Sequence, residues 1–229
     1  MNVFYCPDAV VGTMALLSEQ EAHHAVLVLR MKVGDDIYVF NGNGKLFSAV
    51  IASATKKEVA VHVKALLQEQ TSNYFLHIAI APTKQMERLE WLVEKATELG
   101  VSRITPVICQ RSERKEVKIE RLQKAAMAAC KQSKQLVLPQ IDEAVLLEQF
   151  VKADLPEHKF MAWCEVATNK VSSDVFSHTS VVFLIGPEGD FASSEVTLAT
   201  QYGFVPCSLG ASILRTETAG VLVAAKMRR

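Results

Sequence analysis

From residue 74 onward the chain alternates strand-like runs with helical segments, and this alternation is the strongest constraint on its fold. "FLHIAIA" (75–81) and "VVFLI" (181–185) are continuous apolar runs, as in strands buried on both faces. "KQMERLEWLVEKATELG" (84–100) repeats apolar residues with a helical period and ends in glycine. Further strand-like runs lie at 104–109, 159–164 and 204–209, and further helical runs at 117–133, 193–202 and from 216. We therefore predict an α/β fold with a mainly parallel sheet and helices on both faces.

The first part of the chain has a different texture. Short runs rich in β-branched and aromatic residues lie at 33–40, 45–52 and 58–63, and "NGNG" (41–44) supplies a turn. Ser18 and Glu21 have the spacing of a capping box, which predicts a helix over 19–30 with an apolar stripe of Ala22, Ala25, Val26 and Leu29. We predict a small β-barrel or sandwich domain at 1–70, a linker at 66–73, and a second domain at 74–229.

Composition excludes several classes of protein. The hydrophobic fraction of 49% and the charged fraction of 22% are those of an ordinary globular chain. No apolar run approaches the ~20 residues of a membrane span, and the N-terminal sequence lacks the features of a secretion signal. The five cysteines are scattered, without a C-x-x-C pair, which argues against a disulfide framework or a zinc site. We expect a cytoplasmic protein with no membrane partner and no metal.

Residues 103–134 concentrate positive charge in a chain whose net charge is zero. The segment holds nine basic and three acidic side chains. Such a stripe can be a solvated helix face, but it also suits a partner whose phosphates bind in one place.

Two loops near the C-terminus combine glycine with charge directly after apolar runs. "IGPEGD" (185–190) lacks the motifs of phosphate-binding and dinucleotide-binding loops, and its two carboxylates suit a cation better than a phosphate. "LGASILRTETAG" (209–220) places apolar residues and one arginine before a helix. Ser193 and Thr216 are expected to cap the two helices that follow. Because ligands of parallel sheets bind beyond the carboxyl ends of the strands, the loops predict one pocket, suited to a neutral adenosine with a positive sulfur.

Six motifs carry a resemblance to a known family. They are "LVLR" (27–30), "KATELGV" (95–101), "QRSERK" (110–115), "KQSK" (131–134), "IGPEGDF" (185–191) and "LGASILRTETA" (209–219). In these motifs the chain resembles the small-subunit ribosomal RNA methyltransferase E family, which methylates N3 of a uridine in 16S ribosomal RNA. The resemblance implies an N-terminal PUA-like barrel, a C-terminal SPOUT domain with a deep trefoil knot, S-adenosylmethionine as the methyl donor, and a homodimer. The substrate would be 16S rRNA, within the assembled small subunit.

The resemblance and the loop chemistry together assign the candidate site. The donor would lie against Leu184, Gly186, Pro187, Glu188, Gly189, Ser208, Leu209, Gly210, Ile213 and Leu214. The RNA would contact Arg30, Lys84, Arg111, Arg114, Lys131 and Lys134. Arg215 is the candidate catalytic residue, because its guanidinium could stabilise the anion left when N3 loses its proton. An ion pair with Glu188 or Glu217 is the structural alternative for Arg215, and no side chain is an obvious general base.

The chain departs from the family at three positions, and two other functions remain open. Asp190 stands where many members have glycine, Lys131 where an acidic residue is common, and Gln135 where an arginine is common. A non-catalytic RNA-binding module would need the barrel and the basic segment but no donor pocket. A related enzyme acting on tRNA is the second alternative.

Overall fold

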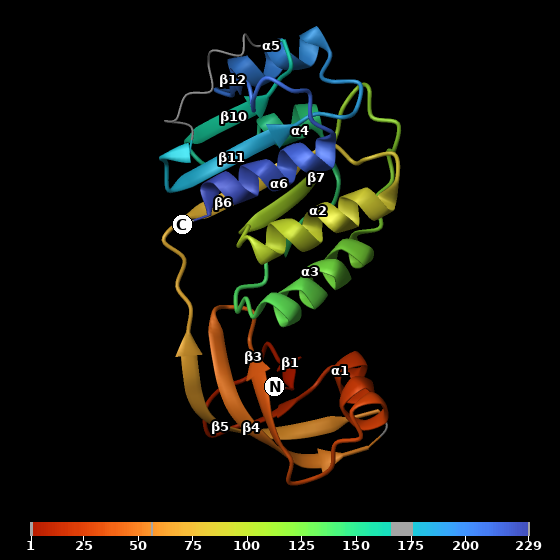
Figure 1. Ribbon diagram of the computed structural model, residues 1–229, viewed down its shortest axis with the longest axis vertical. Coiled ribbons are helices and arrows are strands. Elements are labelled where there is room, and N and C mark those ends of the chain that lie inside the picture. Colours follow the sequence, from red (N-terminus) through yellow and green to blue (C-terminus); the bar gives the residue numbers. More distant parts are fainter. Residues whose placement is uncertain (1, 56, 166–175, 229) are drawn as a thin grey trace. The chain divides into compact units, whose positions relative to one another are not determined.

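The computed structural model describes residues 2–55, 57–165 and 176–228. The chain forms two compact units (Figure 1). The first comprises Met1–Thr71 with Cys130–Leu138, and the second comprises Ser72–Ala129 with Pro139–Arg229. The first unit therefore includes a segment from the middle of the sequence, which no local pattern indicates.

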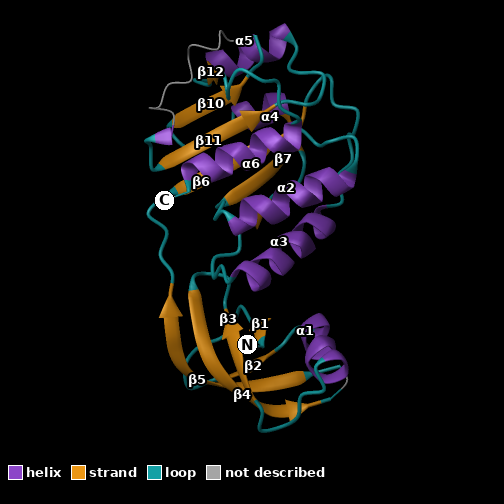
Figure 2. Ribbon diagram, in the orientation of Figure 1, coloured by secondary structure: helices purple, strands orange, loops and turns teal. Residues whose placement is uncertain are grey.

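A five-stranded sheet forms the first unit, in the order β1-β3-β4-β5-β2 (Figure 2). The strands are β1 (Val3–Tyr5), β2 (Met14–Leu16), β3 (Asp36–Phe40), β4 (Lys45–Ala54) and β5 (Val59–Glu69). β1 runs parallel to β3 and the other pairs are antiparallel, with register shifts between the two long strands. Their inward side chains form one apolar core. The sequence missed the two shortest strands, and the predicted linker was wrong at its start because β5 continues to Glu69.

The predicted helix over 19–30 is present in altered form. The Ser18 hydroxyl accepts a 3.3 Å hydrogen bond from the Glu21 amide, and α1 (Glu19–His23) follows this cap. A π-helical turn, η1 (His24–Val28), then replaces the α-helix. Because this wider turn changes the angular spacing of the side chains, the end of the stripe faces outward and Leu29 is 40% exposed.

The second unit contains a parallel sheet, as predicted. Its strands are β6 (Phe75–Ile80), β7 (Arg103–Ile108), β8 (Gln140–Ile141), β9 (Val145–Leu146), β10 (His158–Ala162), β11 (Ser180–Ile185) and β12 (Val205–Cys207). Their order is β12-β10-β11-β6-β7-β8, and β9 also pairs with β7. Every one of these pairs is parallel. The strands β12, β10 and β11 are neighbours, so the loops that follow them leave the same edge of the sheet.

Helices cover both faces of this sheet (Figures 1 and 2). On one face α6 (Thr216–Met227) packs on β6 and β11 and against α2 (Met86–Glu98). On the other, α4 (Leu147–Val151) and α5 (Ser193–Gln201) bury apolar side chains against the alternate strand residues. α3 (Ile119–Ser133) completes the helices. The predicted stripe of α2 is buried except at half-buried Leu99, and Gly100 ends the helix with a φ of +86°.

The α/β architecture with a parallel sheet, preceded by a small β domain, agrees with the predicted fold class, while the trefoil knot stays a prediction. Across the described ranges, no helix combines the length and the apolarity needed to cross a bilayer.

Candidate functional site

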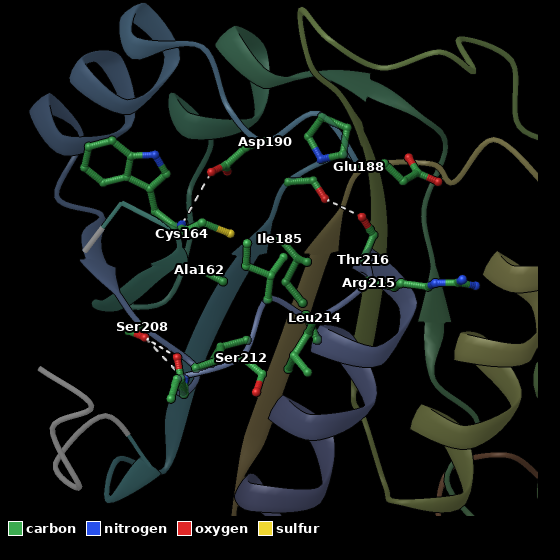
Figure 3. Close-up of a pocket in the computed structure, with 18 residues that line it drawn as sticks. Ala162, Cys164, Ile185, Glu188, Asp190, Ser208, Ser212, Leu214, Arg215 and Thr216 are labelled. Carbon is green, nitrogen blue, oxygen red and sulfur yellow. Dashed lines mark hydrogen bonds between the residues drawn. The ribbon is translucent and has the colours of Figure 1, made fainter. Parts of the chain in front are cut away.

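Three loops at the carboxyl ends of β10, β11 and β12 surround one pocket of about 290 Å³ (Figure 3). The pocket is lined by the end of β10 and its loop (Ala162, Trp163 and Cys164), by the end of β11 and its loop (Ile185, Gly186, Pro187, Glu188 and Asp190), and by the loop after β12 with the start of α6 (residues 208–216 and Ala219). The two loops singled out from the sequence therefore meet in one site. The β10 loop was missed, because only the strand order places it beside the other two.

Most of the predicted donor residues line this pocket, and two do not. Gly186, Pro187, Glu188, Ser208, Leu209, Gly210, Ile213 and Leu214 all belong to the lining. Leu184 is fully buried in the core beneath α4 and α5, because strand alternation turns its side chain to that face. Gly189 lies outside the lining, and its carbonyl accepts a 2.9 Å hydrogen bond from Arg111 Nη1.

The β11 loop depends on a tight turn around Gly186 and Asp190. A Cβ atom at Gly186 would come within 2.9 Å of Phe191 Cε2, so a larger residue would displace the ring. Asp190 adopts a left-handed φ of 59°, which explains why glycine suits this position and why aspartate is tolerated. The Asp190 carboxylate accepts hydrogen bonds from Phe191 N at 2.8 Å and from Cys164 N at 3.4 Å. The departure from the family at 190 thus links the β10 and β11 loops.

The loop after β12 is held by hydroxyl groups. Ser208 Oγ donates to the Gly210 carbonyl at 3.0 Å and accepts from Gly210 N at 3.3 Å. Gly210 has a φ of +145°, a conformation that favours glycine. Thr216 Oγ1 donates a 2.9 Å hydrogen bond to the Gly186 carbonyl and so joins this loop to the β11 loop.

Both predicted helix caps were wrong by one residue. Arg215 occupies the N-cap of α6, so Thr216 is its first helical residue, and its hydroxyl is used across the pocket instead. Ala192 occupies the N-cap of α5, and the Glu195 carboxylate accepts a 2.9 Å hydrogen bond from Ala192 N. The carboxylate of the third residue of α5 thus satisfies the amide of the N-cap residue.

Arg215 lies at the rim of the pocket. Its side chain is exposed and extends from the lining towards α2 (Figure 3). Neither expected ion pair involves it: Glu188 Oε1 accepts from Lys84 N at 3.2 Å, and Glu217 Oε1 lies 3.9 Å from Arg88 Nε. The structural alternative for Arg215 is therefore not found among the described residues.

Two arginines in the loop after β7, Arg111 and Arg114, donate hydrogen bonds to backbone carbonyls of loops beside the pocket. Arg111 Nη1 donates to the carbonyls of Gly189 and Phe191, the second at 3.3 Å. Arg114 donates to the carbonyls of Thr83 at 3.1 Å and Lys84 at 2.7 Å. These guanidinium groups hold loops of their own unit, a role that the sequence did not predict.

Of the other predicted RNA contacts, Lys84 belongs to the second unit, where its Nζ lies 2.9 Å from Glu113 Oε2, and Arg30, Lys131 and Lys134 belong to the first. Arg30 and Lys134 are exposed and have left-handed φ angles of 56° and 61°. Lys131 forms an ion pair with Glu21, whose side chain is buried. Gln135 Oε1 accepts a 2.7 Å hydrogen bond from Gln70 Nε2. Lys131 is therefore engaged inside this unit, whereas Arg30 and Lys134 present their charge to solvent.

The chemistry of the pocket fits the expected donor. Ile185, Leu209 and the 85% exposed Ile213 supply apolar surface for a nucleoside, while Glu188 and Asp190 supply negative charge for a cationic sulfur. Burial, and then the Asp190 carboxylate, raise the pKa of the Cys164 thiol, so it stays protonated at neutral pH. In the described part of the chain no three His, Cys, Asp or Glu side chains are grouped for a metal ion.

Comparison with known proteins identifies the family. An RNA methyltransferase domain matches residues 70–228, and an RNA methyltransferase PUA domain matches residues 17–64. The chain is 32% identical to ribosomal RNA small subunit methyltransferase E of Rickettsia conorii, over 93% of this chain and 88% of that protein. It is 28% identical to the Bacillus subtilis protein of the same name, over 89% of this chain and 85% of that protein.

Solved structures agree with this result. A Legionella pneumophila structure in complex with the bound cofactor SAM superposes with a TM-score of 0.88 at 32% identity, covering 98% of this chain and 96% of that one. Ribosomal RNA small subunit methyltransferase E from Neisseria gonorrhoeae, bound to S-adenosyl methionine, superposes with a TM-score of 0.85 at 26% identity, covering 99% and 96%. The chain belongs to the ribosomal RNA small subunit methyltransferase E family.

Proposed function

We propose that the protein transfers a methyl group from S-adenosylmethionine to N3 of a uridine in 16S ribosomal RNA. The observation that carries this proposal is the pocket formed by the loops after β10, β11 and β12, which combines apolar surface with two carboxylates. The same fold holds this donor in the structures from Legionella pneumophila and Neisseria gonorrhoeae.

Different pocket residues are proposed to bind different parts of the donor. Gly210, which has open space where a Cβ would stand, allows the adenosine to approach the backbone closely, Leu209 supplies apolar surface, and Glu188 and Asp190 face the positive charge. When bound, S-adenosylmethionine supplies a methyl group on a positive sulfur, and its transfer to N3 leaves a neutral thioether and releases one proton. Orientation of the two reactants supplies a large part of the catalysis, roughly 7–11 kcal/mol.

Arg215 is proposed to stabilise the substrate anion. Loss of the N3 proton spreads negative charge over the two flanking carbonyl oxygens, and a guanidinium at the pocket rim can bind that charge. N3 lies on the pairing edge of uracil, so the uridine must be unpaired or flipped out to reach the site.

The two units are proposed to divide recognition and chemistry. Residues 1–70 would bind RNA as a PUA-like domain, and residues 74–229 would form the knotted methyltransferase domain. Exposed Arg30 and Lys134 are the clearest candidates for phosphate contacts. Lys84, Arg111, Arg114 and Lys131 would contribute through N–H groups beyond those used in their internal bonds, since a guanidinium carries five and an ammonium three.

We further propose a cytoplasmic homodimer acting on the assembled small subunit. The test is to incubate the purified protein with S-adenosylmethionine and either small subunits, free 16S rRNA or tRNA, and to digest the RNA for mass spectrometry. N3-methyluridine in 16S rRNA supports the proposal. Modification of tRNA alone would favour the related enzyme class, and RNA binding without donor binding would favour a non-catalytic module.

A further inference from the structure

The first turns of α2 and α6 contain a buried carboxylate with an unsatisfied oxygen. Glu217 is 7% exposed, and its Oε1 lies 3.9 Å from Arg88 Nε. Its Oε2 is buried and has no hydrogen-bond partner among the described residues. Burying a charge without full compensation destabilises a protein, so an arrangement of this kind calls for a functional explanation.

The two helices bring their positive ends together at this place. α2 and α6 pack so closely that a Cβ atom on Gly220 would collide with Leu92, one turn beyond Arg88 and Glu217. The N-cap residues Gln85 and Arg215 make no side-chain capping bond. Two helix N-termini without side-chain caps therefore lie side by side, and each favours negative charge nearby.

Two guanidinium groups flank this corner. Arg215 extends from the pocket rim towards α2 (Figure 3), and Arg88 stands on the first turn of α2 with a third of its side chain exposed. Two neighbouring carboxylates are engaged by Lys84, whose Nζ lies 2.9 Å from Glu113 Oε2 and whose backbone amide donates to Glu188 Oε1. Arg88 and Arg215 are thus the two arginines that stand at the first turns of α2 and α6.

We propose that Arg88 is a second substrate-binding guanidinium and that Glu217 is its positioning residue. This inference rests on the proposed methylation of a uridine. The anion formed at N3 carries its charge on two carbonyl oxygens, and Arg88 and Arg215 provide one guanidinium for each. The open Glu217 Oε2 can accept a further N–H of Arg88 as the guanidinium turns to the substrate, which fixes its orientation.

The test is the single-turnover rate at saturating donor and RNA, measured across neutral and alkaline pH. Stabilising the anion lowers the pKa of N3 in the complex, so Arg88→Gln should lose roughly 10²-fold near neutral pH, as for a lost oxyanion donor. The rate deficit of Arg88→Gln should shrink as the pH rises, because the N3 proton then dissociates without stabilisation by Arg88. Arg88→Lys should recover part of the rate. Glu217→Gln should lower the rate less, without lowering Tm, because it removes a buried charge.

Lys95→Gln, two turns further along the same helix and half-buried like Arg88, is the matched control and should follow the wild-type profile. A deficit of Arg88→Gln that is constant with pH, or a weakened donor affinity as its main effect, would overturn the proposal. So would a loss of Tm in Glu217→Gln that accounts for its lower rate. An inactive wild-type protein would instead contradict the proposed function itself.

Discussion

Thr216 and Gly186 lie thirty positions apart in the sequence, and a hydrogen bond of 2.9 Å from Thr216 Oγ1 to the Gly186 carbonyl joins them. Thr216 is the first residue of α6, and Gly186 follows β11. The bond is partly buried, since Thr216 is 4% exposed and Gly186 is half-buried. It closes the two donor loops onto each other at the side of the pocket.

Replacing Thr216 by valine should remove the hydrogen bond that joins the two donor loops. Valine has nearly the same shape but leaves the Gly186 carbonyl without its donor, which costs about 1–3 kcal/mol for a buried group. We expect S-adenosylmethionine to bind roughly 5- to 150-fold more weakly in calorimetric titration, by that free energy. Thr216→Ser keeps the hydroxyl and should bind almost normally. Equal donor affinity in Thr216→Val and wild type would show that the bond does not shape the pocket.

Gly210→Val should abolish donor binding by placing a side chain in the pocket. Gly210 has a φ of +145° with no atom within 4 Å of a built Cβ, so valine meets strain but no clash in the empty site. Gly12 is the matched control, with a φ of +82° and equally open surroundings in the first unit. Both valine variants should lose about 1–3 kcal/mol of stability. Only Gly210→Val should lose the rise in Tm that the donor causes, and a normal rise would place this loop outside the site.

The sequence predicted the second unit well because its signals are local. Continuous apolar runs give β6 and β11, and the helical period gives α2, since each pattern records burial within one element. The order of the strands is not local. That is why the loop at 162–164 was missed, although β10 before it was recognised.

The errors at individual residues have physical causes of the same kind. Asp190 was noted only as a departure from glycine, and no pattern shows that its carboxylate makes two hydrogen bonds while its backbone adopts the left-handed conformation. Arg111 was read only as a candidate RNA contact, because no pattern shows that the Gly189 carbonyl lies within reach of it. Tertiary contacts of long polar side chains produce no periodic pattern in the sequence, so they cannot be predicted from it in the way that helices and strands are.

Arg111→Met should therefore weaken donor binding as well as RNA binding. The change removes the bonds to the carbonyls of Gly189 and Phe191, and we expect roughly 5- to 30-fold lower donor affinity. Lys134→Gln, in the first unit, should leave donor affinity unchanged while reducing the salt dependence of RNA binding by about one charge. Calorimetric titration with the donor measures the donor affinities, and RNA binding at a series of salt concentrations measures the salt dependence. Normal donor affinity in Arg111→Met would contradict the bracing role.

His77 should make the second unit less stable in mild acid. It is 1% exposed on β6, and its Nε2 lies 2.7 Å from Thr105 Oγ1. Burial, and then the charge of Arg103, lower the pKa of His77 to about 4 from 6.5. The unfolded chain therefore binds more protons between these values, so stability falls as pH drops through this window, by about 3 kcal/mol in all.

Urea unfolding at a series of pH values measures this effect. His77→Gln should be less stable at neutral pH, because a buried bond is changed, but should lose less on acidification. His62→Gln, at an exposed position on β5, should keep the wild-type pH dependence. An unchanged acid dependence in His77→Gln would show that other groups cause it.

Arg215→Ala should separate catalysis from binding. Its guanidinium keeps its charge at any working pH, and the described residues show it in no ion pair. If it stabilises the uracil anion, the interaction strengthens only as the proton leaves. The single-turnover rate should then fall roughly 10²–10³-fold, as for a lost oxyanion donor, while donor and RNA affinities change far less.

Arg215→Lys distinguishes shape from charge at the same position. A point charge cannot reproduce the planar fork of a guanidinium, so lysine should recover only part of the rate. If the side chain were only structural, Arg215→Ala would lose Tm or donor affinity, and its activity would fall in proportion. A stable Arg215→Ala protein that transfers methyl groups at nearly the wild-type single-turnover rate would end the catalytic assignment and leave anion stabilisation to Arg88 and the two helix N-termini.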